Sequence, residues 1–124
     1  HTNAIKASLT VEENMKIMHV LAGKKSKIDY SSILEKIGMS NMNNILTSDI
    51  STGQKRRVGL TRLFMSESKL WFLDEPFNAL DKHGKNIIEK IITKHCNNGG
   101  MVLFTTHQKI EIDDYPIQNI HLGK

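Results

Sequence analysis

The stretch Leu70-Trp71-Phe72-Leu73-Asp74-Glu75-Pro76 decides the fold. Four apolar residues in a row, ended by two carboxylates and a proline, are typical of a strand buried on both faces of a parallel sheet. A second apolar run, at residues 101–105, follows the strong turn signal Asn97-Asn98-Gly99-Gly100 and predicts the next buried strand. A last strand is expected over residues 117–122, after the break at Tyr115-Pro116.

A helix is predicted between the first two strands. Asp81 can cap its first turn, because an Asp side chain accepts hydrogen bonds from the free N–H groups there. One apolar stripe at helical spacing then follows, formed by Ile87, Ile88, Ile91 and Ile92. Strand, helix and strand in succession are the βαβ unit of a parallel sheet, so we predict an α/β fold.

The chain before this unit is expected to be mainly helical. Thr10 and Glu13 have the spacing of a capping box and predict a helix over residues 11–22. Ser32 and Glu35 have the same spacing and predict a second, short helix that closes at Gly38. Residues 39–51 are expected to form a loop or a frayed helix, and residues 54–66 a third helix.

Length and composition bound the class of protein. The 124 residues allow one domain or part of one, and a 39% hydrophobic content is enough to form a core. A net charge of +4 fits a solvated basic face and is compatible with phosphate or an anionic surface. One cysteine, Cys96, excludes an internal disulfide. We expect a soluble chain without leader or membrane span, because the longest apolar runs fall far short of about 20 residues.

Two places in this framework can carry chemistry. Ser51, Gly53 and Gln54 lie at a predicted helix start, where free N–H groups, a hydroxyl and a glycine suit a phosphate; a glycine there is also a common structural device. Asp74 and Glu75 follow a buried strand, where ligands bind in open α/β sheets. One carboxylate can hold hydrated Mg²⁺ while the other polarises water. The alternative is that the two acidic residues only mark the end of the strand before Pro76, and this interpretation applies about as often.

The remaining candidates are less specific. His107 ends the second strand and can donate a hydrogen bond to a phosphoryl group, although a lone histidine there is often incidental. Arg56-Arg57 suggests nucleic acid only faintly, since arginines on a helix are more often solvated or paired. His95-Cys96 offers too few ligands for zinc. Met15 and Met18 are interpreted as core residues rather than a partner surface.

The order of these residues resembles that of ATP-binding cassette ATPases. Residues 50–57 (ISTGQKRR) resemble the signature motif, residues 70–74 the Walker B strand, Glu75 the catalytic glutamate, residues 78–81 (NALD) the D-loop and His107 the switch histidine. Within that family the chain is most similar to ATP-binding subunits of haem exporters in cytochrome c maturation. That similarity rests on residues 70–82, on residues 99–108 and on the opening positions His1, Ile5, Lys6, Leu9, Thr10, Glu13 and Asn14.

The resemblance implies part of a P-loop NTPase sheet with a helical subdomain. Residues 1–50 would hold the helical subdomain and the approach to the signature, and residues 51–124 the C-terminal part of the RecA-like core. ATP and Mg²⁺ are the implied cofactors, and ATP hydrolysis by the full-length protein is the implied activity. The implied partners are a second identical nucleotide-binding subunit and transmembrane transporter subunits, at the cytoplasmic face of the bacterial inner membrane.

The resemblance also implies a role for each matched residue. Two subunits would sandwich two ATP molecules, and Ser51, Gly53 and Gln54 would reach the nucleotide held by the partner. In the other half of the site, Asp74 would position Mg²⁺ and Glu75 would activate water. His107 would steady the developing charge, and Asp81 would communicate across the dimer.

Departures from the family pattern set the remaining expectations. Thr52 replaces the first glycine of the signature, Ile50 replaces its leucine, and no G-x-x-x-x-G-K-[ST] phosphate loop is present. We therefore expect the chain to be the C-terminal portion of a longer domain and to be inactive alone. A non-transport cassette protein acting on nucleic acid or the ribosome, and a docking module without catalysis, are the alternatives; nucleic acid is not favoured.

Overall fold

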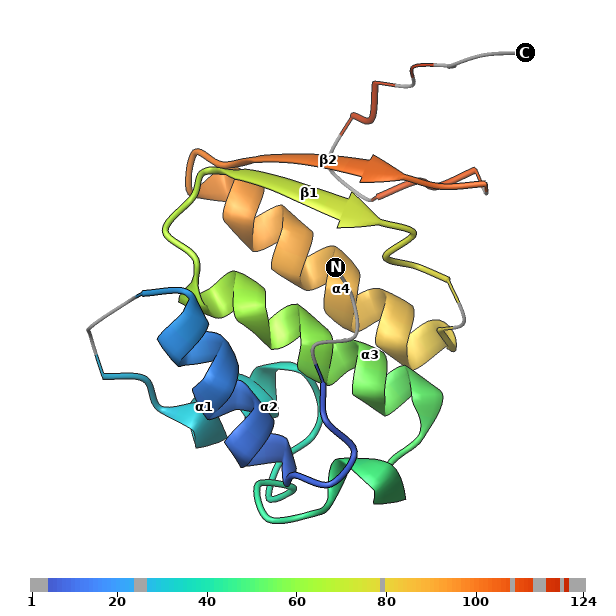
Figure 1. The fold of residues 1–124 in the computed structure, drawn as a ribbon. Coiled ribbons are helices and arrows are strands. Elements are labelled where there is room, and N and C mark those ends of the chain that lie inside the picture. Colours follow the sequence, from blue (N-terminus) through green and yellow to red (C-terminus); the bar gives the residue numbers. More distant parts are fainter. Residues whose placement is uncertain are drawn as a thin grey trace.

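The computed structural model describes residues 5–23, 27–78, 80–107, 109–112, 116–118 and 120. A parallel pair of strands, β1 (Leu70–Asp74) and β2 (Met101–Thr105), forms the top layer in Figure 1. Below it lie α4 (Lys82–Asn97) and then α3 (Thr52–Leu60), with α1 (Val11–Leu21) and α2 (Tyr30–Lys36) on the far side (Figure 1). The predicted α/β class and the βαβ unit are confirmed.

The sheet is buried on one face only. Its register pairs Leu70 with Met101 and Asp74 with Thr105. Trp71 and Leu73 point toward α4 and are buried, whereas their neighbours along the strands are exposed. The prediction of a strand buried on both faces was therefore wrong for the part of the chain described, because α4 covers a single face. The other, which we call the open sheet face, consists of Leu70, Phe72, Met101 and Leu103.

α4 begins and ends where its sequence predicts. Asp81 Oδ1 accepts a hydrogen bond from the Gly84 N–H at 2.7 Å, which caps the first turn. At the last turn, the His95 ring stacks on Trp71 with centroids 3.6 Å apart, and its Nε2 lies 2.8 Å from the Lys69 carbonyl. A Cβ added at Gly100 would overlap the His95 ring, so glycine leaves the space that this ring fills. The apolar stripe meets the sheet through Ile88 and Ile92.

α1 carries the predicted capping box, in which the Thr10 and Glu13 side chains each accept a backbone N–H. Met15 and Met18 are buried in a hydrophobic cluster with residues of α2 and α3, which confirms the core interpretation. Glu12 ties α1 to the loop that follows α2. The hydrogen bond from Asn43 is the largest effect on this carboxyl and lowers its pKa. Burial has a smaller effect that raises the pKa, and the nearby Lys16 lowers it further.

Two predicted helix starts were wrong in detail. α2 is capped by Asp29, whose Oδ1 accepts from the Ser32 N–H at 3.1 Å, so Ser32 is its third residue and not its cap. Gly38, with φ 74°, closes this helix as predicted. α3 begins at Thr52, two residues early, because Ser51 and Gln54 form a capping box of their own. Its predicted last turns are the 3-10 helix η2 (Thr61–Met65).

The chain between and after these elements contains little regular structure. Residues 39–51 form a loop with one 3-10 turn, η1 (Thr47–Asp49), as expected. Residues 117, 118 and 120 are not in a strand, and Ile117 instead packs its side chain on the core beside the sheet, so the predicted last strand was wrong there. Residues 119, 121 and 122 lie outside the described residues. Across the described ranges, every helix is too short or too polar to cross a bilayer.

Candidate functional site

Asp74 and Thr105 end the two paired strands at the same edge of the sheet. Thr105 Oγ1 donates a hydrogen bond to Asp74 Oδ1 at 2.6 Å. The Glu75 N–H is shared between the Thr105 carbonyl at 3.1 Å and the Thr105 hydroxyl at 3.2 Å. One threonine therefore fixes both the carboxylate of Asp74 and the backbone of Glu75.

Glu75 adopts a backbone conformation that non-glycine residues avoid, with φ 48°. The left-handed region costs an L-residue roughly 1–2 kcal/mol, and such residues cluster at functional sites. The surrounding chain holds it there from both sides of the residue. Thr105 takes the N–H, and the carbonyl accepts from Arg56 Nη1 at 2.9 Å and from the Asn78 N–H at 3.1 Å.

The left-handed turn places the Glu75 carboxylate beside His107. His107 Nε2 lies 3.3 Å from Glu75 Oε1, within reach of a hydrogen bond or, with the ring protonated, an ion pair. The His107 side chain is 96% exposed and that of Glu75 24% exposed. Asp74, Glu75 and His107 thus gather at the carboxyl end of the sheet, where parallel α/β folds bind ligands.

Ser51, Gly53 and Gln54 lie at the start of α3, and α4 separates this helix from the sheet (Figure 1). Ser51 Oγ accepts from the Gln54 N–H at 3.1 Å, and Gln54 Oε1 accepts from the Ser51 N–H at 2.9 Å. The side chain of Ser51 is thus engaged within the first turn and lies in a separate group from the carboxylates. The first-turn N–H groups of an exposed helix end remain suited to an anion.

Asp81 lies at the far end of the segment that begins with Glu75. Besides capping α4, its Oδ1 lies 3.8 Å from Arg57 Nη2. Arg57 is buried and also donates to the Ile37 carbonyl at 3.4 Å. Together with the contact from Arg56 to Glu75, this means that two consecutive residues of α3 reach both ends of residues 75–81.

Local sequence patterns missed three residues of this site: Arg56, Arg57 and Thr105. The arginines stood out as a basic pair, and the structure shows them paired inside the chain. Thr105 gave one faint signal, a hydroxyl at the end of an otherwise apolar strand. Their partners lie 19 to 31 residues away in sequence, beyond any local spacing rule.

The donor set at this edge fits Mg²⁺. Asp74 is exposed, and Mg²⁺ usually takes one or two carboxylates, waters and substrate phosphates rather than an all-protein cage. The described ranges hold no cluster of three or more His, Cys, Asp or Glu side chains able to bind a metal. The His95 ring stacks on Trp71, and its Nε2 contacts the Lys69 carbonyl. Burial raises the pKa of the neighbouring Cys96 thiol.

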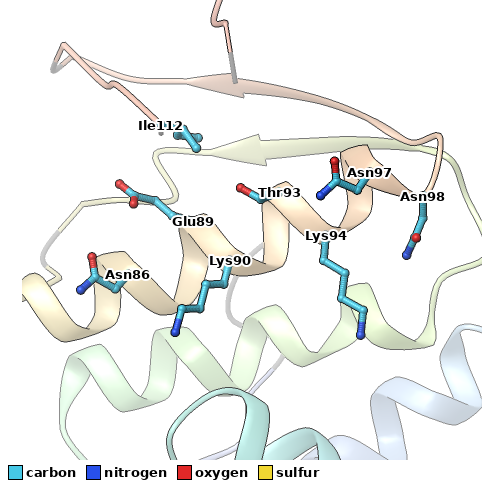
Figure 2. Close-up of a pocket in the computed structure, with 8 residues that line it drawn as sticks. All are labelled: Asn86, Glu89, Lys90, Thr93, Lys94, Asn97, Asn98 and Ile112. Carbon is cyan, nitrogen blue, oxygen red and sulfur yellow. The ribbon is translucent and has the colours of Figure 1, made fainter. Parts of the chain in front are cut away.

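A groove of about 560 Å³ lies elsewhere, along the outer side of α4 (Figure 2). None of the predicted site residues lines it, so it does not bear on the site at the sheet edge. The residues that line it come from α4, from its C-cap Asn98 and from one later residue: Asn86, Glu89, Lys90, Thr93, Lys94, Asn97, Asn98 and Ile112.

Solved structures with this fold are ATP-binding cassettes. The ATP-binding subunit of an ABC transporter aligns with a TM-score of 0.70 and 22% identity over 84% of this chain and 45% of that chain. A dimeric, post-hydrolysis ATP-binding cassette bound to ADP and Pi aligns with a TM-score of 0.69 and 20% identity, over 85% and 49%. At these identities the likeness shows the fold.

Curated relatives are closer in sequence. The cytochrome c biogenesis ATP-binding export protein CcmA of Aliivibrio fischeri is 36% identical over 100% of this chain and 61% of its own length. CcmA of Shewanella oneidensis is 41% identical over 90% of this chain and 51% of its own length. The chain therefore spans about half to three fifths of these relatives.

The family model described as ABC transporter matches residues 1–78, which include the signature-like residues, β1 and Glu75. The same residues build the start of α3 and the carboxylate edge of the sheet in the structure. The family model covers more than half of the chain and the relatives match nearly all of it, so the chain belongs to the ABC transporter family.

Proposed function

We propose that this chain is the C-terminal part of the ATP-binding subunit of an ABC exporter that hydrolyses ATP. The observation that carries the proposal is the gathering of Asp74, Glu75 and His107 at the carboxyl end of the parallel sheet, with Glu75 held in a left-handed turn. Membership of the ABC transporter family implies that the ligand is ATP. The geometry brings together side chains that can act as acid and base on it.

Glu75 is the base in this proposal. Its carboxylate orients and polarises the attacking water, and His107, 3.3 Å away and exposed, donates to the phosphoryl oxygen that gains charge. Asp74, whose Oδ1 is engaged by Thr105, holds Mg²⁺ through its carboxylate. Bound Mg²⁺ supplies charge neutralisation at the phosphate oxygens.

The start of α3 serves a second nucleotide, held by a second copy of the subunit. Ser51, Gly53 and Gln54 present the first-turn N–H groups of α3 to that γ-phosphate, and the separation of this turn from the carboxylates supports a site shared between two chains. Asp81 lies at the opposite end of the segment from Glu75 and communicates between the two sites.

The transported compound is haem, or an intermediate of haem delivery, in cytochrome c maturation. This assignment follows the names of the relatives that are 36% and 41% identical to this chain. Membrane subunits carry the compound, and the ATP-binding subunit is peripheral at the cytoplasmic face of the bacterial inner membrane. The basic pair Arg56-Arg57 was the feature that suggested nucleic acid, and both arginines are engaged inside the chain. A role on nucleic acid therefore stays the less favoured alternative.

The division into residues 1–50 and 51–124 belongs to the same proposal. The hydrophobic cluster that packs α4 on the sheet lies within residues 51–124 and supports the division, whereas a second cluster packs α1 and α2 on α3 across the boundary. Val58, Met65 and Ile87 come from the second part and pack in this second cluster, so the two parts share an apolar contact.

ATP hydrolysis by the full-length subunit with its membrane partners tests the proposal. Glu75→Gln removes the base and keeps a similar shape, so kcat should fall at least about 100-fold while ATP still binds. Glu67→Gln, an exposed change of the same kind before β1, is the matched control and should keep wild-type turnover. Turnover by Glu75→Gln within about twofold of wild type would contradict the proposal.

Two further measurements separate the parts of the proposal. The 124-residue chain alone should show no ATP turnover, because the main phosphate contacts are missing from it. In a strain lacking the endogenous gene, the wild-type subunit should restore covalent haem on c-type cytochromes and the Glu75→Gln subunit should not. Active ATP hydrolysis without such restoration would keep the ATPase and reject the haem-export assignment.

A further inference from the structure

We propose that Arg56 is a positioning residue for Glu75, because it holds the backbone carbonyl of that residue. The inference rests on the proposed function, because it takes Glu75 as the base. It concerns a side chain that hydrogen-bonds the backbone of Glu75.

The contact itself is specific. Arg56 Nη1 donates to the Glu75 carbonyl at 2.9 Å in a part-buried position. Since a charged donor makes a stronger hydrogen bond than a neutral one, this bond favours the one carbonyl direction that it can reach. Together with the contact that Thr105 makes to the Glu75 N–H, this bond holds the backbone of Glu75 at φ 48° and so fixes the direction of its Cα–Cβ bond. From that starting direction the carboxylate reaches the position beside His107.

A second contact holds Glu75 from the sheet. Thr105 accepts the Glu75 N–H with both its carbonyl and its hydroxyl, while the hydroxyl donates to Asp74. The backbone of Glu75 is thus held by β2 through its N–H, and through its carbonyl by Arg56 of α3 and by the Asn78 N–H. Removing either contact lets the left-handed turn relax toward more populated backbone angles.

Full-length subunit variants test the role of Arg56. Arg56→Met keeps the length of the side chain and removes the donors, so kcat should fall about 10-fold or more while KM for ATP changes less than about twofold. Arg56→Lys, which keeps a charged donor, should recover part of the loss. Arg62→Met makes the same change at an exposed residue of η2 and should keep wild-type kcat.

A double-mutant cycle separates positioning from general damage. If Arg56 acts through Glu75, Arg56→Met should lower the residual turnover of Glu75→Gln by less than about twofold. A structural role would lower both backgrounds equally. Equal losses, or an Arg56→Met variant with wild-type kcat, would overturn the inference, and in both cases the Glu75→Gln result would leave the proposed function standing.

Thr105 variants keep the test decisive if Arg56→Met fails to fold. Thr105→Val has the same shape without the hydroxyl, and Thr105→Ser keeps the hydroxyl. Loss of kcat with Val and recovery with Ser should follow the same cycle with Glu75→Gln. The Thr105 carbonyl still accepts the Glu75 N–H in Thr105→Val, so the loss of kcat should be smaller than in Arg56→Met. No loss at all, or equal losses in the wild-type and Glu75→Gln backgrounds, would overturn the inference.

Discussion

At the scale of single residues, Gly38 lets the end of α2 pack closely against α4. Its φ is 74°, and a Cβ added there would lie 2.9 Å from Ile87 Cδ1 and 3.2 Å from His83 Nε2. Gly23 has nearly the same φ of 70°, and among the described residues no atom outside its chain neighbours would lie within 4 Å of an added Cβ. The two glycines therefore separate the cost of the backbone conformation from the cost of close packing.

Gly23→Ala should lower the free energy of unfolding by about 1 kcal/mol, the cost of a left-handed L-residue. Gly38→Ala should cost about 1–3 kcal/mol more, because Ile87 must move in a packed core. Urea denaturation of both variants measures the difference. Equal losses at the two positions would show that α2 and α4 are packed more loosely than the structure indicates.

At the scale of elements, α4 depends on Asp81 in two ways, as a helix cap and as a partner of Arg57. The cap is a 2.7 Å hydrogen bond to the Gly84 N–H, whereas the ion pair is 3.8 Å long and the Asp81 side chain is 73% exposed. Exposed pairs of this length contribute little to stability. The cap is therefore the larger contribution.

Asp81→Asn keeps an oxygen for the cap and removes the charge, so it should cost less than about 0.5 kcal/mol of stability. Asp81→Ala removes both and should cost about 1 kcal/mol. Thermal or urea unfolding of the two variants tests this order. A loss in Asp81→Asn as large as in Asp81→Ala would instead give the ion pair the main role.

Elements with a cap and a clear apolar period could be predicted from the sequence. Thr10, Asp81 and the isoleucine stripe marked helices that the structure confirms. The start of α2 could not be fixed, because Asp29 and Ser32 both lie where a cap is possible and only the backbone at Asp29 decides. The exposed side of β1 was missed since an apolar run does not show how many faces are covered.

The candidate site divides in the same way. Asp74, Glu75 and His107 could be placed at one edge because the ends of neighbouring parallel strands meet there. The left-handed backbone of Glu75 and its contact with Arg56 could not, because both depend on how α3 packs near the sheet. Spacing along the chain says nothing about that packing.

At the scale of the whole molecule, the open sheet face is an exposed apolar patch on the surface. Phe72 and Met101 are 64% and 66% exposed, and Leu103 is 51% exposed beside Phe72 in the register of the sheet. Contiguous apolar patches of this kind associate in water, and unpaired strand edges add to the tendency.

The 124-residue chain, studied alone, should therefore self-associate at micromolar concentration, and Phe72→Glu should shift it toward monomer. Val20→Glu changes an equally exposed apolar residue, 77% exposed on α1, and should leave the association in place. Sedimentation velocity over a range of concentrations measures both. A wild-type chain that stays monomeric throughout would contradict the prediction.

The stacked ring of His95 carries a consequence for how this fold diverges over generations. Its imidazole fills space that exists because position 100 has no side chain. A larger residue at position 100 fits only where position 95 already has a smaller side chain. The change at position 95 must therefore come first. The two sites should behave as an epistatic pair, in which a substitution harmful in one ancestral background becomes neutral once the other has occurred.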